Sequence, residues 1–113
     1  MPATRLARSQ IAASVAAAGS AANDATALVG GCAVYPVSAA DDTKGVIMHQ
    51  HDAVTGNKIE IVNSVSNKIL KVYPPTSGTI NGAAANVAVS SVSGKGLTLR
   101  CIAGGVGGTW GTV

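Results

Sequence analysis

Large aromatic side chains are scarce in this sequence of 113 residues, which has no Phe, one Trp and two Tyr. Hydrophobic residues make up 47% of the chain, but much of that fraction is Ala, which buries little apolar surface. A single copy therefore has few large side chains with which to build a core. Small chains of this kind commonly gain stability by oligomerising, so we expect the protein to assemble with partners.

Charge is also sparse, because only 12% of the residues are charged and the formal net charge is +3. Arg5 and Arg8 lie near the N-terminus, and the other basic residues are scattered. A nucleic-acid-binding protein usually concentrates its positive charge and interleaves aromatic residues for stacking. Neither pattern is present, so we expect no direct binding to nucleic acid. The low charge instead fits a surface that partners cover.

The sequence has two cysteines, Cys32 and Cys101, far apart and without CxxC spacing. A disulfide-dependent secreted miniprotein usually carries more cysteines. Free thiols and a Cys32–Cys101 disulfide both remain open at this point. No stretch approaches the roughly 18–20 apolar residues of a membrane span, so we expect no membrane association.

The N-terminal segment imitates a signal peptide, because Arg5 and Arg8 precede an Ala-rich run at residues 11–18 that small residues follow. The run is only weakly hydrophobic, which argues against secretion. We expect this segment to remain part of the protein as an arm.

Residues 4–18 favour a helix, because Ala dominates and Gly19 can end it. The apolar stripe of this helix, with Ile11 and Val15, is too weak to hold it in isolation. We therefore expect residues 1–26 to form a partly helical arm that lies on a neighbouring subunit or a larger surface. A frayed tail is the alternative.

Alternation predicts short strands in the remainder, and residues 58–63 are the clearest case. Ile59 and Ile61 alternate with Lys58 and Glu60, which is the pattern of a half-buried strand. Further strands are predicted at residues 27–37, 45–50, 68–73, 87–92 and 97–102.

Turn residues separate these predicted strands. Gly30-Gly31 suggests a bulge, and Pro36 is expected to end its strand. Gly94-Lys95-Gly96 is expected to join the last two strands as a hairpin. Six to eight short strands with closely spaced turns predict an all-β domain over residues 27–113, shaped as a small sandwich or barrel.

Few side chains suggest chemistry. His49 and His51 would share one face of a strand and could bind an ion together, above all on the axis of a trimer. Two ligands without a third are weak evidence, so we expect no metal and no cofactor. Cys101 ends an apolar run, where a buried thiol fits better than a nucleophile. We do not expect an enzyme.

The only Trp, Trp110, lies in a Gly-rich C-terminal segment. Its isolation among glycines suggests that it anchors this segment in a pocket of its own domain or of a neighbour.

One stretch also carries a family resemblance. Tyr-Pro-Pro at residues 73–75 is followed by Ser-Gly-Thr-Ile-Asn-Gly, Ala-Ala-Asn, Gly-Lys-Gly, an apolar run ending in Cys101 and Gly-Gly-Thr-Trp. Over residues 46–110 this order resembles a module of tailed-bacteriophage virion proteins, which recurs in capsid decoration (cement) proteins, head fibres and some fibre tips. Its elements are mostly turns and strands, so the resemblance specifies a fold better than a role.

The resemblance implies a capsid decoration protein that binds the lattice of the major capsid protein as a homotrimer and stabilises the head. It would lie on the outer surface of the virion capsid after assembly in the bacterial cytoplasm, which favours free thiols. The expected trimer interface comprises Val87, Val89, Leu97 and Leu99. The expected capsid-binding arm comprises Arg5, Arg8, Ile11 and Val15. The alternative is a head-fibre or tail-fibre tip that binds a receptor or glycan, with Trp110, Tyr35 and Tyr73 as its only aromatic candidates.

Overall fold

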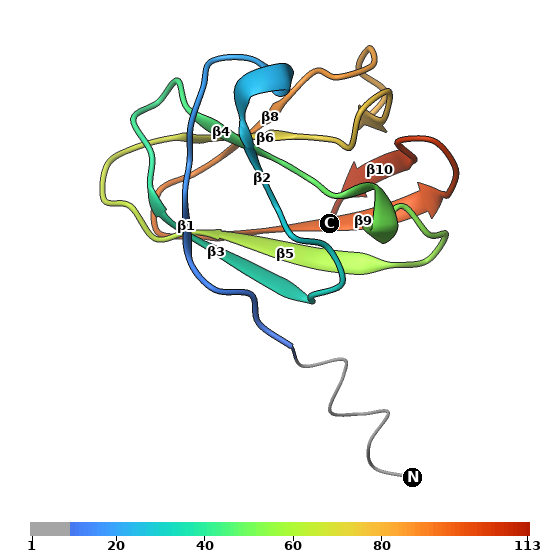
Figure 1. The fold of residues 1–113 in the computed structure, drawn as a ribbon, viewed down its shortest axis with the longest axis horizontal. Coiled ribbons are helices and arrows are strands. Elements are labelled where there is room, and N and C mark those ends of the chain that lie inside the picture. Colours follow the sequence, from blue (N-terminus) through green and yellow to red (C-terminus); the bar gives the residue numbers. More distant parts are fainter. Residues whose placement is uncertain (1–9) are drawn as a thin grey trace, which may run out of the picture.

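The computed structural model of the chain describes residues 10–113, and the expected arm residues Arg5 and Arg8 lie outside this part (Figure 1). Ten strands form two sheets, which confirms the predicted all-β class. The six-stranded sheet contains, in spatial order, β1 (Val15–Ala16), β3 (Val34–Ala39), β5 (Lys58–Asn63), β9 (Gly96–Ala103), β10 (Thr109–Thr112) and β7 (Thr79–Ile80). The four-stranded sheet contains β2 (Thr26–Ala27), β4 (Gly45–Ile47), β6 (Leu70–Tyr73) and β8 (Val89–Ser91). Two short 3-10 turns complete the described elements, η1 (Ala22–Asp24) and η2 (Gln50–Asp52).

The first six strands wind as a two-sided coil. The chain alternates between the sheets, and β1, β3 and β5 pair in parallel in one sheet while β2, β4 and β6 pair in parallel in the other. Each turn of the coil therefore lies directly on the preceding one. Parallel strands need a crossover connection, which is usually a helix; here a strand of the opposite sheet supplies it.

Antiparallel strands cover the last turn of the coil. β9 pairs with β5, and β8 pairs with β6. The hairpin predicted across Gly94-Lys95-Gly96 is therefore wrong, because β8 and β9 belong to different sheets. Gly94 still makes a turn with a positive φ of 73°, but this turn carries the chain from one sheet to the other.

The core lies between the two sheets and holds most of the large side chains of the sequence. Trp110 and Tyr35 are each 1% exposed. Aliphatic residues from both sheets surround them, namely Val37, Val46, Ile59, Ile61, Leu70, Val72, Ile80 and Leu99. The core is thus more substantial than the composition suggested, because the Trp and both Tyr residues are buried.

The helix predicted for residues 4–18 is absent from its described part, residues 10–18. This segment is extended and runs beside β3, with Ala12 N donating to Val34 O and Ala17 N donating to Ala39 O, both at 2.9 Å. Ala17 is also only 6% exposed and belongs to the core. Sheet pairing and burial thus override the helix propensity of Ala. The segment from Gln10 to Ala18 is extended, and it pairs with β3 at Ile11 and along β1.

Pro36 lies inside β3 rather than at its end, which corrects a second prediction. Ala33 and Val37, each an odd number of residues from Pro36, direct their carbonyls toward the β5 segment, since Val37 O accepts from Ser64 N and Ala33 O accepts from Glu60 N. Pro36 therefore turns its nitrogen toward the short strand β1, at the edge of the sheet. A proline is tolerated there because little of the hydrogen-bond ladder is lost.

A fully buried amide ties the two sheets together. Asn63, at the end of β5, is 0% exposed. Its Nδ2 donates to Lys68 O at 2.8 Å and to Ser91 O at 3.1 Å, and its Oδ1 accepts from Val65 N at 3.1 Å. One side chain thus links the six-stranded sheet to β8 and to the loop that leads into β6.

Candidate functional site

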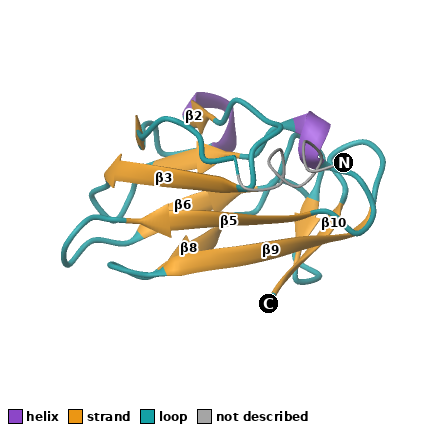
Figure 2. Ribbon diagram, turned by 90° about the horizontal axis from the view of Figure 1, so that it is seen from below, coloured by secondary structure: helices purple, strands orange, loops and turns teal. Residues whose placement is uncertain are grey.

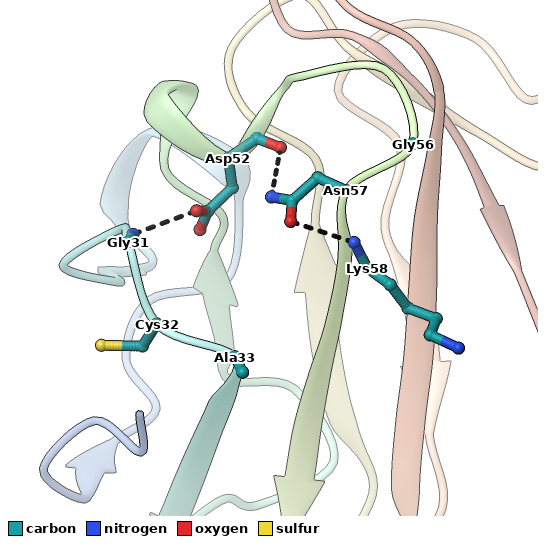
Figure 3. A pocket seen from close by; sticks show the side chains of 7 residues that line it. All are labelled: Gly31, Cys32, Ala33, Asp52, Gly56, Asn57 and Lys58. Atoms are coloured by element: carbon teal, nitrogen blue, oxygen red, sulfur yellow. Dashed lines mark hydrogen bonds between the residues drawn. The ribbon is translucent and has the colours of Figure 1, made fainter. Parts of the chain in front are cut away.

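A pocket lies where the coil turns between β2 and β3 and between β4 and β5. It has a volume of about 390 Å³ and is lined by Gly31, Cys32, Ala33, Asp52, Gly56, Asn57 and Lys58 (Figure 3). The carboxylate of Asp52, a residue only 3% exposed, accepts from Gly31 N at 3.0 Å and from the hydroxyl of Tyr35 at 2.7 Å. That hydroxyl in turn accepts from Cys32 N at 3.1 Å. Burial and the hydrogen bond to Asp52 raise the pKa of Tyr35 well above its ordinary value, so the phenol stays protonated and donates.

This network holds loops together rather than assembling a reactive group. The Cys32 thiol points away from Asp52 in Figure 3, and no histidine lines the pocket. A nucleophilic thiol needs an adjacent base, and the lining residues do not supply one. Cys32 and Cys101 are both free thiols, and burial raises the pKa of Cys101.

The two histidines lie at the start of η2, not on a strand. Their ring centroids are 4.5 Å apart, and His49 Nδ1 accepts a hydrogen bond from His51 N. That bond occupies one of the imidazole nitrogens that a metal would use. Within residues 10–113, no three His, Cys, Asp or Glu side chains come together as a metal site.

All three aromatic side chains of the sequence are buried. Trp110 packs in the core of its own chain and donates its indole N–H to Gly107 O at 2.9 Å. It thus fills a pocket of its own domain, which was one of the two alternatives. Tyr35 is 1% and Tyr73 9% exposed. A glycan-binding surface usually presents aromatic faces for stacking, and none of these rings is available.

The four residues expected at a trimer interface differ in exposure. Leu99 is 0% exposed in the core of a single chain, and Val89 and Leu97 pack against that core. Val87 is 45% exposed. They also lie on both sheets, because Val89 belongs to β8 of the four-stranded sheet, whereas Leu97 and Leu99 belong to β9 of the other. The structure therefore does not bring these four side chains together on one free surface.

The outward side of the six-stranded sheet is the largest feature that sequence reasoning missed. We call it the outer face, and Figure 2 looks onto its strands β3, β5 and β9. Its apolar side chains are Ile11, Val34, Pro36, Val62, Ile102 and Val113. Three of these six are more than half exposed. Its charged side chains are Lys58, Glu60 and Arg100, and none of them forms an ion pair with another described residue.

A central row crosses five neighbouring segments of this outer face. Ile11 pairs with Val34, Val34 with Glu60, and Glu60 with Thr98. Val113 completes the row by donating its N–H to Thr98 O at 3.0 Å. The alternation around Ile59 and Ile61 indicated that Glu60 points outward, but the neighbours of Glu60 depend on a strand pairing that the sequence did not reveal.

A groove of mixed polar and apolar lining lies beside the opposite sheet. Two adjoining cavities of about 530 and 390 Å³ share Asn86 and lie between residues 20–23 and residues 86–88. Lys71 and Tyr73 contribute to the floor of the larger cavity. Tyr73 lies close over Gly45 and donates its hydroxyl to Ser20 O at 3.3 Å. The Tyr73 ring therefore packs against its own chain and links β6 to residue 20, rather than presenting its face to a ligand.

No family model matches the chain, and the search of curated proteins finds no match. Within residues 10–113, no helix has the length and apolar character needed to cross a membrane.

Proposed function

We propose that the protein is a bacteriophage capsid decoration protein, a non-enzymatic component of the virion. In this proposal it assembles as a homotrimer and binds the lattice of the major capsid protein on the outer surface of the head. The observation that supports it is the residue pattern over 46–110, which resembles virion proteins of tailed phages.

The surface of the chain is compatible with such a role. Only 12% of the residues are charged, and the outer face carries six apolar side chains. Exposed apolar patches with few charges mark surfaces that partners cover. A protein that adds buried area across joints between capsid subunits would oppose the outward pressure of packaged DNA.

The expected arm divides into two parts. Ile11 is 64% exposed and remains available to a partner, whereas Val15 packs against the core. Removing residues 1–22 would delete β1 and the buried Ala17, and would therefore damage the fold. A deletion of residues 1–9, which include Arg5 and Arg8, leaves every described strand in place and is the sharper test.

The experiment mixes purified protein with undecorated capsids of the encoding phage and measures bound protein after sedimentation. The full chain is expected to bind, and the 1–9 deletion and the Arg5→Glu/Arg8→Glu variant are expected to bind more weakly. Lys71→Glu/Lys95→Glu changes the charge by the same amount elsewhere and serves as the control. Full-length protein that does not bind these capsids at all would refute the proposed function, and equal binding of the deletion would refute only the role of the arm.

The alternative is a head-fibre or tail-fibre tip that binds a receptor or glycan. No observation favours it, because Trp110, Tyr35 and Tyr73 are all buried. Copy number in purified virions distinguishes the two, since a decoration protein covers the head in many copies and a fibre tip is present in few.

A further inference from the structure

Within residues 10–113, the charged side chains of the outer face form no ion pairs. Lys58 on β5 lies directly opposite Arg100 on β9, and like charges at directly opposed positions of a sheet destabilise it. Glu60 is the one acidic side chain of this face, yet it forms no ion pair with either base among the described residues. A second surface that offers the opposite charges would therefore complement the acid and the two bases of this face.

The position of the Glu60 carboxylate follows from a glycine. Gly96 lies on β9, and a Cβ placed there would collide with the Glu60 carboxylate. The Glu60 side chain therefore lies flat across β9 above Gly96. Gly111 similarly leaves space that the Ile102 side chain occupies. The Glu60 and Ile102 side chains thus lie over glycines of neighbouring strands.

Thr98 consequently lies midway between an anion and a cation along β9. The Glu60 carboxylate sits over Gly96, two residues to one side of Thr98, and Arg100 lies two residues to the other side. A two-fold axis that passes above Thr98 on the outer side, parallel to the sheet and perpendicular to β9, would place each of these two positions opposite the other one in the second copy. Each Glu60 carboxylate would then meet Arg100 of the other copy, while the apolar side chains of the central row would meet their own counterparts.

We propose that two copies of this chain pair through their outer faces, with reciprocal Glu60–Arg100 ion pairs around an apolar centre. Two sheets can pack face to face at about 10 Å with their strands nearly aligned. The pairing gives Arg100, which lies opposite Lys58 in its own chain, an attractive carboxylate partner in the other copy. It is also isologous, since the same patch serves both copies.

The size of the outer face sets the expected strength. Five strands about 4.8 Å apart and about 20 Å of strand length give about 500 Å² per copy. A total of about 1,000 Å² is at the lower limit for a specific interface, so the dissociation constant is expected to be on the order of 10 µM.

This inference goes beyond the proposed function, because it concerns contacts between copies whether or not a capsid is present. A three-fold contact elsewhere on the chain, with its axis perpendicular to and intersecting the two-fold axis, would combine with the pairing to give six chains, and without a three-fold contact the pairing gives two. In both cases, breaking the outer-face contact halves the mass of the assembly. The two proposals can therefore fail separately.

The test is sedimentation velocity of the full-length chain, which has a mass of 11.0 kDa, from about 1 µM to 1 mM, a range that brackets the expected dissociation constant. Glu60→Arg and Arg100→Glu are each expected to weaken the pairing roughly tenfold or more, because each removes both ion pairs and creates repulsion. The double variant Glu60→Arg/Arg100→Glu restores opposite charges across the interface and is expected to recover the pairing. Lys71→Glu, on the opposite sheet, is the control and should behave as the native chain.

Trp110 fluorescence verifies that each variant is folded. A measurement on the native chain in about 0.5 M NaCl gives a second readout that needs no substitution, and screening should weaken the pairing there. A native chain that stays monomeric, a trimer that neither single variant changes, or a double variant that does not recover would overturn the proposal.

Discussion

Replacing Asn63 with Asp tests whether one buried amide holds the two sheets together. The two side chains have nearly the same shape, but the substitution replaces the Nδ2 donor with an oxygen. Lys68 O and Ser91 O then lose the hydrogen bonds that they accept at 2.8 and 3.1 Å. A carboxylate at this fully buried position would also face both carbonyl oxygens.

Leaving a buried polar group unsatisfied costs about 1–3 kcal/mol. Two such groups and a buried charge predict that Asn63→Asp lowers the free energy of unfolding by about 3–5 kcal/mol at pH 7.5. Burial and the neighbouring carbonyls should raise the pKa of the introduced carboxyl above its unfolded value of about 4. The loss of stability is therefore complete above the raised pKa and diminishes as the pH falls toward about 4, because the protonated acid can donate one bond.

Urea unfolding followed by the fluorescence of the single, buried Trp110 measures this effect at pH 7.5 and pH 5. Asn67→Asp is the matched control, since Asn67 is exposed and its side chain forms no hydrogen bond with another described residue. The control should change the unfolding free energy by less than about 0.5 kcal/mol. If Asn63→Asp were no less stable than Asn67→Asp at both pH values, the amide would not be coupling the sheets.

Three further predictions concern the loops and turns. Tyr35→Phe should lower the free energy of unfolding by about 1–3 kcal/mol in urea titrations, because Asp52 and Cys32 N both lose a buried partner; unchanged stability would contradict the role of this hydroxyl. The pKa of Tyr35 is raised in the folded state, so the stability that the protonated phenol contributes is present below the unfolded pKa of about 10 and is lost as the pH rises above it. Tyr35→Phe should therefore flatten the fall in the free energy of unfolding between pH 9 and pH 11. Equal slopes for the variant and the native chain would argue against a buried phenol. Gly78→Ala should destabilise the protein by more than about 2 kcal/mol in thermal melts, because the added Cβ would collide with the backbone of Gly107. Gly94→Ala is the control and should cost about 1 kcal/mol, because Gly94 has a positive φ but lies in open space. A larger loss for Gly94→Ala than for Gly78→Ala would contradict the close approach of the loops that contain Gly78 and Gly107.

The sequence predicted the strands better than their partners. Residues 58–63 form β5 with the predicted bounds, because alternation of burial is a local property of a strand. Parallel pairing is not local. Val34 pairs with Glu60 because one whole turn of the coil separates them along the chain. No turn residue in the sequence indicates how long that turn is.

The helix predicted for the N-terminal segment was wrong for a related reason. Its Ala content expresses helix propensity, whereas its structure depends on β3, which lies some twenty residues further along the chain. Pro36 was judged as a strand breaker because its position beside the short edge strand could not be known.

The arrangement of charged side chains on the surface could not be predicted for the same reason. Lys58, Glu60 and Arg100 were each visible as charges, and Glu60 was correctly expected to face outward. Their arrangement follows from the antiparallel register of β5 and β9, which only the structure gives. Likewise, nothing in the spacing of Tyr35 and Asp52 signalled that they share a buried hydrogen bond.

The winding of the first six strands makes chain length adjustable in whole turns. Residues that pair across neighbouring turns are separated by 20 positions between Thr26 and Val46 and by 26 between Val34 and Glu60. A turn contacts only its neighbours, so its stability depends on adjacent turns rather than on the whole domain. An added turn of this length, inserted between β2 and β3, would extend both sheets by one strand and leave the register of β5 with β9, and hence the positions of Glu60 and Arg100, unchanged. The number of strands in each sheet could thus change without altering the antiparallel strands that cover the last turn of the coil.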